Sequence, residues 1–245
     1  EHGGYNPWMA DGLWKPHFEG QPAYLTPAII NYSNGPCGFA YNPGTALSEK
    51  YRNYFFVTEF PGKNIRAFRT KPEGAGFKMV DEHVAHHGLM TTGINFGPDG
   101  ALYLADWGNN GWAPHEKGRI MKLDSPRAID RPLRIQTRKL LGDGFAMRDD
   151  TELSRLLAHA DQRVRLESQF ELVKRNASNA LLTVAKENDS QLARIHAIWG
   201  IGQLGRKEQD AIIPLRPLLN DRDPEIQAQL LRVISDAYHN DFSEE

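Results

Sequence analysis

The sequence of 245 residues has one cysteine, no long apolar run and no excess of one charge. Because Cys37 is alone, this chain can form no intrachain disulfide and carries no CxxC metal site or CxxCH haem site. No apolar run approaches the roughly 20 residues that a membrane-spanning helix needs. The formal net charge of −2, with scattered Lys and Arg, gives no reason to expect nucleic acid or an anionic membrane as a partner.

What is present is typical of a soluble globular protein. The hydrophobic fraction is 40% and the charged fraction is 24%. The length is sufficient for one large domain or two ordinary ones. The chain begins at Glu1 rather than Met and shows no signal peptide, which predicts a processed product or a fragment.

The stretch Thr91–Trp107 predicts a strand, a tight turn and a second strand. Before Gly97, the large apolar residues Ile94 and Phe96 alternate with Gly93 and Asn95. The following Gly97-Pro98-Asp99-Gly100 has the residues that a turn requires, because proline presets φ and glycine accepts a positive φ. Large and small residues then alternate up to Asp106. Together with the GRIMKLD segment that begins at Gly118, this pattern is typical of a β-propeller blade.

Residues 1–124 predict one antiparallel all-β domain, with its strands from residue 38 onward. Residues 1–36 are rich in Gly, Pro, Asn and aromatic residues, which predicts long packed loops whose aromatic side chains either fill space between sheets or line a carbohydrate pocket. Further strands are expected at 38–41, 54–59, 63–70, within 74–80, and at 92–96, 102–106 and 119–124. This count approaches two four-stranded blades, whereas a closed propeller needs four to eight. We therefore expect a partial propeller.

After residue 150 the spacing of the apolar residues changes from the period of strands to the period of helices. Residues 125–150 contain Pro and Gly and predict an ordered linker with one short strand or helix. Segments 165–172, 194–201 and 227–234 align on one another at intervals of about 30 residues. Helices are also expected at 177–186 and 211–220. The fold class predicted for 151–245 is an all-α repeat of helical hairpins of HEAT type.

The turns between these hairpins predict how the helices begin and how they are joined. An aspartate precedes each aligned helix, at Asp161, Asp189 and Asp223, where its carboxylate can cap free amides. The arginine that follows the turn, at 165 and 194, is expected to tie adjacent hairpins together.

Three stretches resemble one protein family. They are NPWMADGLW (Asn6–Trp14), NGPCGFAYNPGTAL with YFFVTEF (Asn34–Phe60), and GAGF with TTGINFGPDGALYLADWGNNGW and GRIMKLD (Gly74–Asp124). The chain is similar to the C-terminal part of bacterial sorbosone/glucose dehydrogenase-like propeller proteins. In that family a six-bladed quinoprotein-type propeller precedes HEAT-like repeats and often a c-type cytochrome domain. This sequence departs from the pattern at Cys37, where a small hydroxyl residue is usual, and by having no CxxCH segment.

The resemblance implies oxidation of a sugar or sugar-alcohol hydroxyl, with hydride passing to pyrroloquinoline quinone (PQQ) beside Ca²⁺ and electrons passing to haem c outside this chain. It implies a c-type cytochrome domain or protein as partner, and a periplasmic or cell-surface location. The catalytic base of such enzymes comes from blades that precede this segment. The alternative is a non-catalytic propeller–solenoid module that binds a polysaccharide or a protein partner.

Asp106 and Trp107 are the first candidates for a site, because they stand at the end of a predicted strand. Asp106 is a candidate ligand for a metal or a sugar hydroxyl, or it caps the turn through Gly108. Trp107 either stacks on a sugar face or packs between sheets. Arg66 and Arg119 are candidate contacts for a quinone carboxylate, although surface strands often carry arginine.

The histidines in DEHVAHHG are candidate proton acceptors. His86 and His87, with His83, are predicted to lie in a loop, near Asp81 and Glu82. The alternative is that they are polar loop residues bonded to backbone or water. His159, His196 and Trp199 of the helical part are expected to be packing or solvent-exposed residues, and Cys37 has no histidine next to it in the sequence that would make it a nucleophile.

Overall fold

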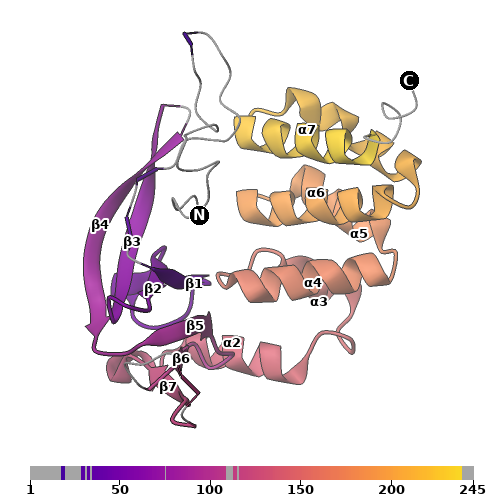
Figure 1. Ribbon diagram of the computed structural model, residues 1–245. Helices are drawn as coiled ribbons and strands as arrows, with labels where there is room; N and C mark the ends of the chain where they lie inside the picture. The colour runs from indigo at the N-terminus through magenta and orange to yellow at the C-terminus, as the bar shows by residue number, and fades with distance from the viewer. Residues whose placement is uncertain are drawn as a thin grey trace.

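The computed structural model describes residues 18–19, 29–30, 32–33, 35–74, 76–108, 113–114 and 116–238. Two antiparallel sheets, neither of them closed, precede a stack of helices, so the chain is mixed α and β (Figure 1). Most of the aromatic N-terminal segment, including Trp8 and Trp14, lies outside the described residues.

The first sheet has four strands in sequence order, each antiparallel to the next. They are β1 (Pro36–Tyr41), β2 (Phe55–Glu59), β3 (Asn64–Glu73) and β4 (Gly76–His87). Bulges in the β3–β4 pairing bring Asp81 to a positive φ of 55°. Strand β4 is longer than the sequence predicts, because the histidine segment continues it.

The second sheet has three strands, β5 (Thr91–Phe96), β6 (Leu102–Asp106) and β7 (Arg119–Leu123). The turn between β5 and β6 is closed by a hydrogen bond from the Gly100 amide to the Gly97 carbonyl, and Gly100 has a φ of 76°. The predicted strand–turn–strand is confirmed. Within the described residues this sheet has three strands, not the four of a complete blade.

The two sheets share one hydrophobic core. Strand β1 lies beside β5, where Gly38 leaves so little room that an added Cβ would lie 2.9 Å from Ile94 Cγ2. Across the core, Phe56 meets Phe96 edge to face at 5.7 Å. The buried side chains of Leu102 and Leu104 belong to the same core, in which the inner faces of the two sheets pack together.

The helices follow in sequence order. They are η1 (Glu49–Tyr51) between β1 and β2, and then, after β7, η2 (Pro126–Ala128), α2 (Pro132–Asp143), α3 (Asp150–Leu156), α4 (Gln162–Lys174), α5 (Ser178–Glu187), α6 (Gln191–Gly205), η3 (Gln209–Asn220) and α7 (Pro224–Tyr238). Helix α2 occupies the segment predicted as a linker.

These helices form two rows around a second core. Helices α4, α6 and α7 lie side by side in one row, while α3, α5 and η3 form the row behind it (Figure 1). Buried Leu and Ile residues from both rows fill the space between them, among them Leu172, Leu181 and Ile201. This hairpin stacking agrees with the repeat read from the sequence, while the assignment to HEAT type, like that of the sheets to propeller blades, stays a prediction.

The prediction that an aspartate caps the helix after each turn is confirmed for two of the three helices. Asp161 Oδ1 accepts from the Arg163 amide, and Asp223 Oδ1 accepts from the Glu225 amide. At α6 the cap is Ser190, which accepts from the Ala193 amide, and not Asp189. The predicted helix at 211–220 is a 3-10 helix, because Pro214 and Pro217 remove the amide donors that an α-helix needs.

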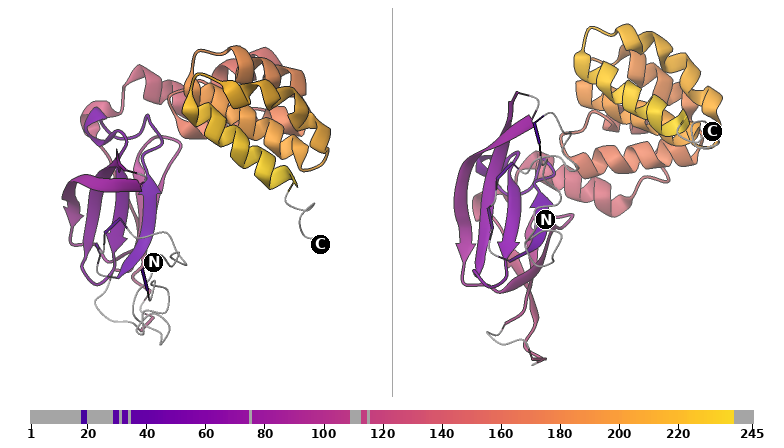
Figure 2. Two further views of the ribbon diagram at one scale, coloured as in Figure 1. Left: turned by 90° about the horizontal axis from the view of Figure 1, so that it is seen from above. Right: turned by 45° about the horizontal axis from the view of Figure 1, so that its top comes forward.

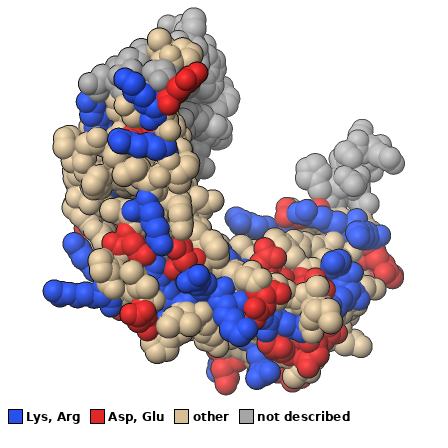
Figure 3. Space-filling view, turned by 90° about the horizontal axis from the view of Figure 1, so that it is seen from below, with Lys and Arg blue, Asp and Glu red and all other residues tan. Residues whose placement is uncertain are grey.

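The sheets and the helices lie side by side and meet at one end, through α2 and the start of α4 (Figure 2). On the face seen from below, acidic and basic side chains are interspersed (Figure 3). Within the described residues no helix is long and apolar enough to cross a membrane.

Candidate functional site

Asp106 is buried, and both of its carboxylate oxygens accept hydrogen bonds from neighbouring residues. Its Oδ1 accepts from the amides of Met90 at 3.0 Å and Gly108 at 3.3 Å. Its Oδ2 accepts from the Arg119 guanidinium, with Nη2 at 2.8 Å and Nε at 2.9 Å. This arrangement favours the alternative in which Asp106 caps the turn. A calcium ion could use this carboxylate only if Arg119 moved away.

Arg119 and Trp107 belong to the same structure at the end of β6. The Arg119 side chain is 60% exposed and pairs with Asp106 across β6 and β7. Trp107 donates its amide to the Met90 carbonyl and packs edge to face on Phe60 at 6.2 Å. These contacts agree with the packing alternative for Trp107, and the quinone-binding role of Arg119 stays a prediction.

Arg66 lies in a different place, on the outer face of the first sheet. Its guanidinium pairs with Glu59 at 3.0 Å and with Glu82 at 2.7 Å, and it stacks over the Tyr32 ring at 5.4 Å. Burial, and then the hydrogen bond to Glu82, raises the pKa of Tyr32 well above its usual value. Because two carboxylates already neutralise Arg66, a quinone carboxylate would have to displace one of them.

The histidines expected in a loop are on strand β4 instead, so the loop prediction is wrong. The bulges of β3–β4 keep this polar segment in the ladder, where His86 lies opposite Ile65 and His87 opposite Asn64. His87 Nδ1 lies 2.8 Å from Asn64 Oδ1. His83 Nε2 lies 3.5 Å from the Tyr51 hydroxyl, across the ring stack that His83 makes with Tyr51.

The predicted candidates therefore form separate groups rather than one site. Arg119 joins Asp106 and Trp107 at one end of β6, whereas Arg66 and the histidines lie on β3 and β4. Within the described ranges no three His, Cys, Asp or Glu side chains gather as metal ligands. Cys37 is exposed, and its thiol donates to the Gly35 carbonyl at 3.6 Å.

A polar cluster lies at the place where the sheets meet the helices. We call the backbone segments 43–45, 96–97 and 160–163 the joint. At its centre the fully buried Asp161 accepts the Thr45 hydroxyl at 2.5 Å on Oδ2. Beside it the Gln162 amide donates to the Pro43 carbonyl at 2.7 Å. Between them Gly44, with a φ of 122°, packs so closely that an added Cβ would lie 2.2 Å from the Ala160 carbonyl oxygen.

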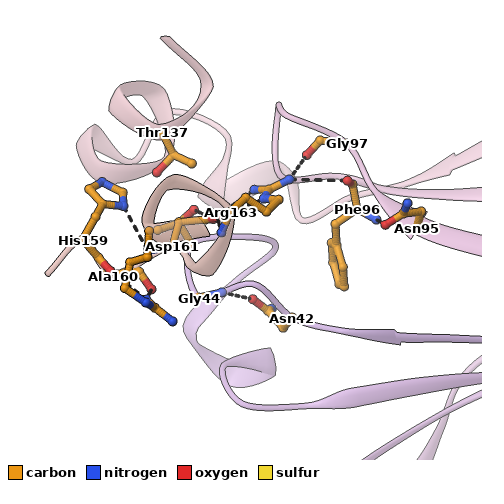
Figure 4. Close-up of polar contacts among 12 residues, drawn as sticks. Asn42, Gly44, Asn95, Phe96, Gly97, Thr137, His159, Ala160, Asp161 and Arg163 are labelled. Atoms are coloured by element: carbon orange, nitrogen blue, oxygen red, sulfur yellow. Dashed lines mark hydrogen bonds and ion pairs between the residues drawn. The ribbon is translucent and has the colours of Figure 1, made fainter. Parts of the chain in front are cut away.

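Arg163 joins the helical side of the joint to the β5–β6 turn. Its Nε and Nη2 pair with Asp161 at 2.9 Å, while its Nη1 donates to the Gly97 carbonyl at 2.6 Å and to the Phe96 carbonyl at 3.4 Å (Figure 4). A guanidinium that is shared between a carboxylate and two carbonyls holds the start of α4 and the β5–β6 turn in one geometry.

A second arginine binds the same turn from α2. The buried Arg134 donates from Nε to the Asp99 carbonyl at 2.6 Å and from Nη2 to the Asp124 carboxylate at 2.8 Å. Carbonyl groups of the Pro-Asp-Gly turn thus accept hydrogen bonds from arginine side chains of two helices, α2 and α4. The sequence pattern of the turn does not reveal this role.

A buried polar cluster continues from the joint into the helical stack. The Arg165 guanidinium donates to the His159 and Ala160 carbonyls and, at 3.2 Å, to His196 Nε2. His196 Nδ1 in turn donates to Gln169 Oε1 at 2.8 Å. Burial, reinforced by the Arg165 charge, lowers the pKa of His196 to about 4, so this imidazole is neutral at pH 7.

Arg165 and Arg194 confirm the prediction that the arginine after each turn joins adjacent hairpins. Arg165 connects the turn before α4 to α6 through His196. Arg194 donates to the Ala185 carbonyl and pairs with Asp221 at 2.5 Å. His196 is a packing residue, as expected, and so is Trp199, whose indole donates to Gln229 Oε1 of α7 at 2.9 Å.

Two grooves lie beside these clusters. One, of about 530 Å³, runs along α4 with an apolar floor that includes Phe145 and Phe170 and a rim of Glu167, Glu171 and Lys174. The other, of about 310 Å³, lies at the joint between β1, β5 and the first turns of α4. An apolar floor with a charged rim is typical of protein-binding surfaces.

Comparison with known proteins adds little to this geometry. No protein family and no curated protein matches the chain. A solved structure that matches in part is a crystal structure of glucose dehydrogenase, with 23% identity over 44% of this chain and 28% of that chain, and a TM-score of 0.33. The chain thus spans less than a third of that protein's length. The likeness is too small to argue fold or activity from it.

Proposed function

We propose that this chain is a coupling module of a sugar dehydrogenase-like protein. In this proposal the two sheets belong to the β-domain that oxidises a sugar or sugar alcohol. The helical stack, fixed to the sheets by the joint, holds a docking surface for the electron acceptor, a c-type cytochrome domain or protein. The assignment to a sugar dehydrogenase-like protein rests on the sequence resemblance. The coupling role rests on the geometry of the joint.

The joint is the observation that carries the coupling role. Asp161 has no exposed surface and receives donors from both parts of the molecule, Thr45 from the sheet side and Arg163 from α4. Loop-to-loop contacts between independent domains are usually exposed and mobile. The Asp161–Arg163 ion pair lies at the start of α4, and both of its members bond across the boundary, Asp161 to the Thr45 hydroxyl and Arg163 to the Gly97 carbonyl. Breaking this buried pair is strongly destabilising, so the pair supports a fixed orientation of the two parts.

The docking surface fits the groove along α4. Phe170 is 46% exposed beside this groove, and charged side chains surround it. Electron-transfer partners use small interfaces with a partly apolar centre and a charged rim, because the complex must form and separate quickly.

PQQ and Ca²⁺ do not fit the candidate residues as they stand. Asp106 and Arg66 are neutralised by internal ion pairs, and the catalytic base is expected in preceding blades. In this proposal the described residues position a partner, and the chemistry of the quinone is supplied elsewhere in the protein. The periplasm or cell surface is the compartment that this setting implies.

The test compares two electron acceptors in a longer protein that contains this sequence, supplied with PQQ, Ca²⁺ and a panel of sugars and sugar alcohols. A small dye reports oxidation alone, whereas a c-type cytochrome also reports docking. We expect Asp161→Ala to leave dye reduction unchanged and to slow cytochrome reduction, with Asp189→Ala as the exposed control.

Failure takes two distinguishable forms. If no sugar is oxidised in the presence of PQQ and no quinone binds, the dehydrogenase setting is wrong, and the alternative of a module that binds a polysaccharide or protein gains support. If both acceptors are reduced equally well by the Asp161→Ala protein, the dehydrogenase setting stands and the coupling role is wrong.

A further inference from the structure

The exposed face of helix α4 carries opposite charges on either side of an aromatic side chain. Glu167, Phe170 and Lys174 all line the groove of about 530 Å³. They follow one another along the helix at intervals of three and four residues, which places their side chains on one face. Phe170 is therefore flanked by an anion toward the start of α4 and by a cation toward its end.

The two flanking charges are little used within the chain. Glu167 is exposed, and among the described residues no cation pairs with it. The Lys174 side chain is 75% exposed, and its Nζ lies 3.9 Å from Glu171 Oε2, a distance at which an exposed pair contributes little. Glu171 is itself held by Arg175 at 2.8 Å. Both flanking charges can therefore pair with a partner that presents the opposite charges in matching order.

The centre of this face is apolar. Phe170 is 46% exposed, and beside it the groove is lined by Leu141 and the buried Phe145. Met147, next in sequence to the groove residue Ala146, is 97% exposed. Aromatic residues and methionine are enriched at the centre of protein interfaces, and charged residues belong to the rim.

A second copy of α4 presents the matching order of charges. When two copies pack antiparallel about Phe170, Glu167 of each copy lies beside Lys174 of the other. One twofold axis thus creates two equivalent ion pairs around a central pair of phenylalanine rings, the self-complementary pattern of an isologous contact. Parallel packing in register would instead place like charges together and is disfavoured.

We propose that the groove along α4 is the contact between two copies of this chain, related by a twofold axis beside Phe170. Phe170 of each copy packs against the groove of the other, and the Glu167–Lys174 pairs form the rim. The pairing does not depend on the sugar dehydrogenase setting. If the coupling role also holds, the second copy occupies the surface proposed for the electron acceptor, so the dimer and the acceptor complex exclude each other.

The test is analytical ultracentrifugation of the whole chain at concentrations up to about 1 mM, because contacts formed by one helix of each copy are small and weak. We expect a monomer–dimer equilibrium that added salt shifts toward the monomer. Glu167→Lys and Lys174→Glu each turn both ion pairs into like-charge pairs, and each should weaken the dimer about tenfold. Glu187→Lys makes the same charge change at an exposed position of α5 outside the groove, and should associate as the unmodified chain does.

Charge exchange ties the dimer to these two residues. The Glu167→Lys chain presents two cations and the Lys174→Glu chain presents two anions. An equimolar mixture should therefore form a heterodimer, although each variant alone associates poorly. The double variant Glu167→Lys/Lys174→Glu restores both pairs and should associate as the unmodified chain does. Recovery of association in the mixture also shows that the two single variants are folded.

Three results would overturn the proposal. One is that the unmodified chain stays monomeric over the whole concentration range at low salt. Another is that it forms dimers which Glu167→Lys and Lys174→Glu leave unchanged. The third is that the mixture associates no better than its two components. These measurements contain no sugar, quinone or cytochrome, so a failure here is distinct from a failure of the coupling role.

Discussion

The Thr45 hydroxyl donates to the Asp161 carboxylate at 2.5 Å, a contact between residues 116 positions apart in the sequence. Thr45 lies in the loop after β1, and Asp161 caps α4. One buried carboxylate therefore starts a helix and at the same time holds the sheet loop against it. The stability of the joint should depend on this side chain more than on any other aspartate of the helical turns.

Asp161→Asn should destabilise the protein by about 2 kcal/mol, because it removes the charge that neutralises Arg163. Asparagine is also a good helix cap, so the loss reports the ion pair and not the start of α4. Urea unfolding measures the effect. The exposed Asp189, which caps no helix, gives the matched control Asp189→Asn, and equal losses in both variants would contradict the central role of Asp161.

Gly44→Ala should cost at least about 2 kcal/mol, because a φ of 122° suits glycine and the new Cβ would collide with the Ala160 carbonyl. Gly74→Ala is the comparison. Gly74 also has a positive φ, of 59°, but an added Cβ there meets no atom within 4 Å, so the cost should be about 1 kcal/mol. If thermal unfolding gives the two variants equal losses, backbone conformation alone explains the effect and the close packing of the joint does not matter.

Stability should fall as the pH is lowered from 6.5 toward 4, because His196 is neutral in the folded protein. Its folded pKa of about 4 lies below the ordinary value of 6.5, so the unfolded chain binds the proton first. The loss is absent above pH 6.5 and complete below about pH 4, and its size is on the order of 3 kcal/mol. It is measured by urea unfolding across this range.

The His196→Gln protein provides the check on that assignment. Glutamine retains an acceptor for Arg165 but does not titrate, so the pH dependence between 6.5 and 4 should become shallower. An unaltered slope in His196→Gln would assign the pH dependence to other groups, of which His159, with a pKa also lowered by burial, is the nearest.

Asp106→Ala should destabilise the second sheet by about 2–3 kcal/mol, because it leaves the buried amide of Met90 and the partly buried amide of Gly108 without their acceptor. Arg119→Gln should cost less than about 1 kcal/mol, since the arginine is largely exposed. Thermal unfolding compares the two. If both cost little, the carboxylate is not structural, and its role as a ligand of a sugar or metal becomes the better explanation.

Local patterns in the sequence predicted the elements of the fold. The alternation around Gly97–Gly100 gave the β5–β6 hairpin because turn chemistry and strand period act within a few residues. The alignment of residues 165–172 with 194–201 predicted the paired helices and the role of the two arginines for the same reason. The prediction of a loop for the histidine segment is wrong. A bulge at Asp81 keeps this polar stretch within strand β4, and no local sequence pattern indicates the bulge.

The joint could not be predicted, because it depends on which distant segments meet. Asp161 has the same sequence pattern as Asp189 and Asp223, yet only Asp161 is buried against the loop after β1. Likewise nothing in the Pro-Asp-Gly turn indicates that Arg134 and Arg163 bind its carbonyls. Asp106, which the sequence offers either as a ligand or as a turn cap, makes the contacts of a structural residue.

The most direct test of the coupling role is the distance between the two parts in solution. Spin labels are attached at Lys71→Cys on β3 and Arg232→Cys on α7, both exposed positions, in a Cys37→Ser background. Electron–electron double resonance should give one narrow distance distribution, which Asp161→Ala broadens and Asp189→Ala leaves unchanged. A broad distribution in the unmodified joint, or a narrow one that survives Asp161→Ala, would contradict the account.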